Sequence, residues 1–187
     1  MKQEINKFCD NWLQKAKNID STNLQGAFDK FFTLYVVYNR LYVETTYRLY
    51  NQGLVNLGYT FPDRKASTNY VIEYLKSSHI DKEFKKDEAV IKAIEELKEI
   101  IKKNKFNIKL HLVTAEPQPE KDAELLKKLE SNDTNTRIFG VLEYIYSIRC
   151  NIFHAQKAYI DRQINVLKPT IIILEKIIRI LFTKLNN

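Results

Sequence analysis

Apolar side chains along most of the chain recur at steps of three and four residues, which is the period of an amphipathic helix. The pattern predicts helices over residues 4–18, 24–50, 67–77, 81–103, 121–130, 137–155 and 159–185. The helix at 24–50 is the most aromatic, with one continuous face made by Phe28, Phe31, Phe32, Tyr35, Tyr38 and Tyr42. Because a helix that is apolar over so much of its girth is usually buried, we expect it at the centre of a bundle. Pro169 is expected to kink the last helix or to mark its restart.

One segment departs from the helical period. Four of its apolar residues alternate with polar ones, as in a strand: Phe106, Ile108, Leu110 and Leu112. A single strand cannot form a sheet, so we expect an extended insertion near residues 105–119 that lies on the helices. The whole pattern predicts an all-α bundle of six to seven helices that forms one domain, residues 1–187.

Composition and charge narrow the function classes. The chain has only 4 Gly and 4 Pro, which argues against a sandwich or barrel of many short strands. The 30 Lys and Arg against 23 Asp and Glu give a net charge of +7. This charge permits an anionic partner such as RNA, but it is also common on protein surfaces that bind no anion.

The cysteines and the late apolar stretch bear on location. Cys9 and Cys150 are far apart and form no disulfide framework, so a cytoplasmic location fits best. The late apolar stretch 171–181 is short and interrupted by charges, and we expect no membrane contact.

Most enzyme templates are absent from the chain. It contains no phosphate-binding glycine loop, no HExxH pair and no GxSxG turn. Cys150 and His154 share a helix face but would make only half of a tetrahedral metal site. The sequence therefore predicts a protein that uses neither a metal nor a cofactor.

The candidate chemistry lies in residues 143–157. Arg149 interrupts an apolar stripe that includes Ile145 and Ile152. Since a guanidinium cannot lose its charge on burial, Arg149 needs an anionic partner or a wet cleft. His154 follows five residues later, about 140° around an ideal helix. The spacing alone does not bring the two side chains together.

This stretch resembles a known family. Arg149 and His154 form an R-x4-H motif near the end of the penultimate helix, and residues 38–42 read Tyr-Asn-Arg-Leu-Tyr on the aromatic helix. Both features, in this order, resemble the HEPN domain. The resemblance implies an HEPN-like helical bundle that forms a homodimer through the R-x4-H helices. It also implies a metal-independent endoribonuclease in a toxin–antitoxin or phage-defence setting, with RNA as the substrate.

The resemblance also implies roles for individual residues. His154 would act as the general acid or base, and Arg149 would bind the scissile phosphate, so that attack by the 2′-hydroxyl leaves a 2′,3′-cyclic phosphate. Asn151 would orient the imidazole or contact phosphate, and Asn39 would support the Arg149 helix. An antitoxin or a nucleotidyltransferase is an expected partner, although Gln156 stands where some family toxins carry the tyrosine that such a transferase modifies.

Two other interpretations remain open. The chain could be a noncatalytic HEPN-like module that binds RNA, a nucleotide or a partner protein. It could also be a helical interaction protein in which Arg149 is structural and pairs with a buried carboxylate such as Glu143 or Glu175. Asn39 and His154 also have structural explanations, as a hydrogen-bonding core residue and as a satisfied helical histidine.

Overall fold

The computed structural model describes residues 1–111, 113–153 and 163–187, and within them the chain is helical and contains no strand. The helices are α1 (Gln3–Lys17), α2 (Leu24–Asn51), α3 (Asp63–Lys65), α4 (Val71–Leu75), α5 (Ser77–Lys85), α6 (Glu88–Lys102), α7 (Pro119–Leu129), α8 (Thr134–Phe153) and α9 (Ile164–Asn186). A π-helical turn, Ala66–Tyr70, joins α3 to α4. The prediction of an all-α bundle is confirmed for these residues.

The expected number of six to seven helices is too low for the described residues. The region predicted as one helix at 81–103 is divided between α5 and α6, because Asp87 caps a new helix by accepting a hydrogen bond from the backbone N–H of Val90 at 3.4 Å. Lys76, with φ of 69°, separates α4 from α5. The apolar period continues across Asp87, so the period alone does not reveal this break. Pro169 lies inside α9 and is not a restart.

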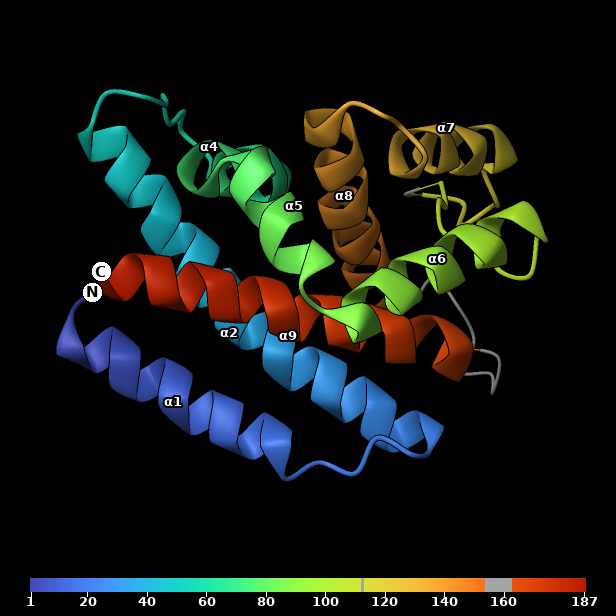
Figure 1. Ribbon diagram of the computed structural model, residues 1–187, viewed down its shortest axis with the longest axis horizontal. Helices are drawn as coiled ribbons and strands as arrows, with labels where there is room; N and C mark the ends of the chain where they lie inside the picture. Colours follow the sequence, from blue (N-terminus) through green and yellow to red (C-terminus); the bar gives the residue numbers. More distant parts are fainter. Residues whose placement is uncertain (112, 154–162) are drawn as a thin grey trace.

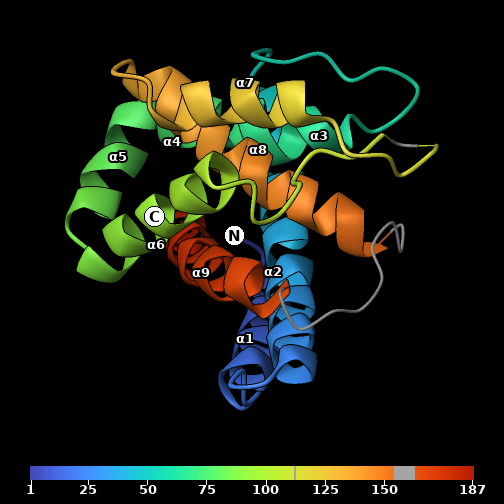
Figure 2. The same cartoon turned by 90° about the vertical axis from the view of Figure 1, so that its right-hand side faces the viewer.

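The long helices cross one another in layers (Figure 1). α9 runs across α2 and packs against it, while α1 lies along the other side of α2. α8 stands steeply to α9, and α7 lies over α8, as the turned view shows (Figure 2). The two ends of the chain meet where the amino group of Met1 donates to the backbone oxygen of Leu185 at 3.1 Å. Across the three described stretches, no helix has both the length and the apolarity needed to cross a bilayer.

The aromatic face of α2 forms the centre of the core, as predicted, except that Phe32, which was expected on this face, is 41% exposed. Phe31, Tyr35, Tyr38 and Tyr42 are fully buried, and their successive ring centroids lie 5.9, 5.7 and 5.3 Å apart. Buried tyrosines need partners for their hydroxyl groups. Tyr38 donates to the backbone oxygen of Ser67, and Tyr42 donates to the carboxylate of Asp63. α2 therefore holds α3 and the π-helical turn in place.

The expected extended insertion is present between α6 and α7. A single antiparallel bridge joins Leu110 to Pro117, and no ladder extends from it in the described chain. The segment is held instead by side chains of the helices. The carboxylate of Asp122 accepts from the backbone N–H groups of Ile108 and Lys109 at 3.0 and 2.7 Å, and the amide of Asn151 donates to the backbone oxygen of Ile108 at 2.9 Å.

α7 and α8 approach closely because Gly140 has no side chain. A Cβ at Gly140 would lie 2.9 Å from the Cβ of Lys128 and 3.2 Å from the backbone nitrogen of Leu129. We predict that Gly140→Val pushes the two helices apart and lowers the free energy of unfolding by about 1–3 kcal/mol, the usual cost of overpacking. Urea unfolding measures this loss. Gly58→Val is the matched control, since nothing lies within 4 Å of its Cβ position. Equal stability of both variants would contradict the close packing.

Candidate functional site

Arg149 lies in the C-terminal part of α8 and points toward α2 and α3. Its guanidinium carbon is 5.7 Å from the ring centroid of Tyr35 and 5.8 Å from that of Tyr146, so both rings contribute cation–π contacts. Its Nη1 lies 3.5 Å from Oδ2 of Asp63. The side chain is 19% exposed. Burial opposes the charge, but Tyr35, Cys150 and Asp63 together raise the pKa of Arg149 above its ordinary value.

Asp63 connects Arg149 to the core. While its Oδ2 faces Arg149, its Oδ1 accepts a hydrogen bond from the hydroxyl of Tyr42. Burial, Tyr35 and the hydrogen bond to Asp63 raise the pKa of Tyr42, so the hydroxyl stays protonated and acts as a donor. The carboxylate is thus fixed on one side by a buried tyrosine and presents its other oxygen to the guanidinium.

The carboxylates named as structural partners of Arg149 have other partners. Glu143 precedes Arg149 by six residues on α8, which turns it to a different side of the helix. It pairs with Arg64, Lys109 and Lys128, and Glu175 pairs with Lys30 at 3.1 Å. The expected pairing of Arg149 with Glu143 or Glu175 is therefore wrong. Asp63, which lies between the helices predicted at 24–50 and 67–77, takes that place.

Glu143 is the centre of a second charge cluster. Its side chain is 3% exposed, and one cationic group from each of three elements lies within 3.0 Å of its carboxylate: Arg64, Lys109 and Lys128. The ammonium of Lys109 also donates to the hydroxyl of Ser147 at 2.9 Å. Burial alone would raise the pKa of Glu143, but the neighbouring cations lower it to about 2. Burial lowers the pKa of Lys109, and Glu143 offsets part of that effect.

The Glu143 cluster opens into a groove of about 800 Å³. Its lining residues come from α7, α8 and the extended segment, and Arg64 of α3 adds one more. Among the described residues, the groove is lined by four cationic side chains, Arg64, Lys109, Lys121 and Lys128, and by two carboxylates, Glu124 and Glu143. Tyr146 and Cys150, on either side of Arg149 in the chain, line its end. We call this hollow the cationic groove.

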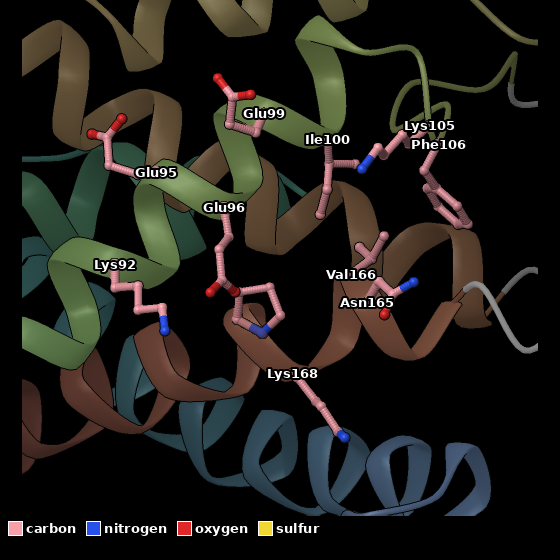
Figure 3. A pocket seen from close by; sticks show the side chains of 11 residues that line it. Lys92, Glu95, Glu96, Glu99, Ile100, Lys105, Phe106, Asn165, Val166 and Lys168 are labelled. Atoms are coloured by element: carbon pink, nitrogen blue, oxygen red, sulfur yellow. The ribbon is translucent and has the colours of Figure 1, made fainter.

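A second hollow, of about 560 Å³, lies between α6 and α9 (Figure 3). Its described lining holds three lysines and three glutamates around an apolar floor that includes Ile100, Val166 and Pro169. Figure 3 shows that the charged side chains point in different directions and do not converge on one spot. The charges balance, and no convergent polar set marks this hollow as a site.

The remaining predicted site residues have different outcomes. Asn151 is buried on the floor of the cationic groove, where its amide donates to the backbone oxygen of Ile108. Asn39 is half-buried on α2, one turn after Tyr35, and makes no hydrogen bond to Arg149 in the described part of the chain. His154 lies outside the described residues. Within those residues, no group of three His, Cys, Asp or Glu side chains is arranged to hold a metal ion.

The sequence does not predict that Asp63, Arg64, Lys109 and Glu143 lie in one region, and it suggests Glu143 only as a partner for Arg149. Lys109 was one of the polar positions of the alternating segment, and that alternation was the available signal: a lysine next to a buried Ile108 must place its charge beside a carboxylate or water.

Comparison with known proteins adds nothing to this geometry. A scan against models of protein families, a search of curated proteins and a search of solved structures each gave no match. The candidate site therefore depends on the residues and contacts of this chain.

We predict that Glu143→Gln destabilises the fold in a pH-dependent way. The pKa of Glu143 is lowered from 4.5 to about 2 in the folded protein. Its charge therefore stabilises the fold above pH 4.5, and that stabilisation is lost as the pH falls toward 2. The shift corresponds to about 3 kcal/mol at pH 7. Urea unfolding at several pH values between 7 and 3 measures the free energy of unfolding of the wild type and of Glu143→Gln. The difference between the two should become smaller as the pH falls. Glu99→Gln, on an exposed part of α6, is the control and should behave as the wild type.

The contact between Arg149 and Asp63 should contribute little to stability. Both side chains are partly exposed, at 19% and 33%, and the two atoms are 3.5 Å apart. We predict a coupling free energy of about 1 kcal/mol or less in a double-mutant cycle of Arg149→Ala and Asp63→Ala. A coupling of about 3–5 kcal/mol would instead show a buried structural ion pair and favour the purely structural interpretation of Arg149.

Proposed function

We propose that this chain is an HEPN-like, metal-independent endoribonuclease, with Arg149 on the scissile phosphate and His154 as general acid or base. The observation that carries the proposal is the setting of Arg149. Its guanidinium contacts Asp63, Tyr35 and Tyr146, which orient it next to the end of a groove rich in cations. This arrangement suits a group that must receive a phosphate.

The chemistry requires few groups. A guanidinium can bind two phosphate oxygens at once and stabilise the charge that develops in the transition state. An imidazole titrates near neutral pH and can take the proton of the 2′-hydroxyl or return one to the leaving 5′-oxygen. The products are a 2′,3′-cyclic phosphate and a 5′-hydroxyl, and the need for a 2′-hydroxyl excludes DNA as a substrate.

The resemblance also favours a homodimer in which the two R-x4-H helices line one cleft. Arg149 lies in the C-terminal part of α8, so two copies that meet there would bring two motifs together. A role as a cytoplasmic toxin or phage-defence effector, controlled by an antitoxin or a nucleotidyltransferase, belongs to the same proposal.

The second candidate function is a noncatalytic HEPN-like module that binds RNA, a nucleotide or a partner protein. The cationic groove favours it, because a surplus of cations can hold an anionic ligand without any chemistry. The two candidates differ in turnover, which a cleavage assay measures directly.

We predict that the purified protein cleaves RNA in the presence of EDTA and leaves 2′,3′-cyclic phosphate ends. Arg149→Ala should slow cleavage about 10²–10³-fold, the usual effect of removing a group that stabilises transition-state charge. His154→Ala should slow it about 10²–10⁴-fold. Gel analysis of end-labelled RNA of varied sequence measures both rates.

His79→Ala is the matched control, because His79 is exposed on α5 and belongs to a different surface. It should cleave at the wild-type rate. Full activity in both Arg149→Ala and His154→Ala would refute the proposed site. Saturable RNA binding by a wild type that does not cleave would favour the noncatalytic module.

A further inference from the structure

The Glu143 cluster holds more positive charge than its one carboxylate neutralises. Arg64, Lys109 and Lys128 surround a single buried anion, which leaves a surplus of two positive charges. Buried and half-buried charges are normally balanced by partners. A single cation would neutralise Glu143, so charge balance alone does not account for the other two, although each of the three also ties its own element to this carboxylate.

The surplus charge is accessible from the cationic groove. Arg64 contacts Glu143 through Nη2 but is 59% exposed, and Lys128 is 32% exposed. Lys121, on the first turn of α7, adds a solvent-exposed ammonium to the same groove. The groove volume of about 800 Å³ falls in the range of pockets that hold ligands of drug size, about 300–1,000 Å³. It can accommodate a short stretch of one strand, but not a duplex.

We propose that the cationic groove binds the phosphate backbone of a single RNA strand and leads it toward Arg149. The strand contacts Arg64, Lys121 and Lys128, while Lys109 stays fixed between Glu143 and Ser147 and contributes its field. Tyr146 and Cys150 line the groove and also contact Arg149, so the groove lies next to the proposed cleavage site. The identity of the strand as RNA rests on the proposed function, but the binding of a phosphate backbone does not.

Phosphate contacts do not read the 2′-hydroxyl, and this separates binding from cleavage. A DNA strand should occupy the groove without being cut. We therefore choose a fluorescein-labelled oligothymidine as the probe and measure its affinity by fluorescence anisotropy over a range of salt concentrations. For a single strand, the logarithm of the association constant falls linearly with the logarithm of salt, with a slope of about −0.7 for each phosphate contacted.

Two variants test the groove, Arg64→Gln and Lys121→Gln. Each removes one positive charge and should reduce the magnitude of the slope by about 0.7 and weaken binding at low salt. Lys121→Gln leaves the Glu143 cluster intact, so it stays informative if Arg64→Gln unfolds. Lys184→Gln is the matched control: it removes an exposed charge of the same kind from another basic hollow, between α5 and α9. Its slope should equal that of the wild type.

The outcomes separate this inference from the proposed function. Equal slopes in Lys121→Gln and Lys184→Gln, or no binding of the oligothymidine by the wild type, would overturn the inference even if the protein cleaves RNA. Reduced slopes in a protein that cuts no RNA would support the groove and count against the nuclease. A competition experiment compares a mononucleotide with unlabelled oligothymidine at the same phosphate concentration. If the mononucleotide displaces the probe equally well, the groove does not bind a strand.

Discussion

The buried carboxylate of Glu143 determines how the parts around the groove are placed. The extended segment has no sheet to join, and α3 is a single short turn, so neither can hold its position through regular backbone hydrogen bonds. Charge-assisted bonds to one fixed anion hold them instead, since Lys109 of the segment, Arg64 of α3 and Lys128 of α7 all end on Glu143. Loss of this anion would leave three cations together and remove one charge-assisted contact from each of the three elements. Gly140 belongs to the same constraint, because it lets α7 come close enough for Lys128 to reach.

α3 links this cluster to the surroundings of Arg149. Its first two residues carry opposite charges and contact different partners. Asp63 contacts Arg149 and Tyr42, while Arg64 pairs with Glu143. The aromatic face of α2 fixes Asp63 through the hydroxyl of Tyr42. The core therefore positions the carboxylate beside Arg149 and, one residue later, a cation of the groove. A displacement of α3 would change both places together.

The helical period was enough to predict the all-α bundle and the central place of α2, because burial of a continuous face depends only on neighbours three and four residues away. Helix breaks depend on single residues, which is why Asp87 divides a segment that the period predicts as one helix. The need of Arg149 for an anion or a wet cleft also followed from its sequence context. The identity of that anion did not, since Asp63 is distant in the chain and lies beside Arg149 through tertiary contacts such as its hydrogen bond from Tyr42.

The two charge clusters differ in how readily an incoming phosphate could enter them. Glu143 is almost fully buried and holds three cations, so displacing it would expose an uncompensated charge and cost several kcal/mol. Asp63 is one-third exposed and meets Arg149 at 3.5 Å, a contact of about 1 kcal/mol or less. A phosphate that offers Arg149 two oxygens forms a stronger contact than this one and can replace it. Under the proposed function, Arg64 and Lys128 would therefore keep Glu143 as a partner while a strand lies beside them, and Arg149 would be the cation that exchanges its carboxylate for a phosphate.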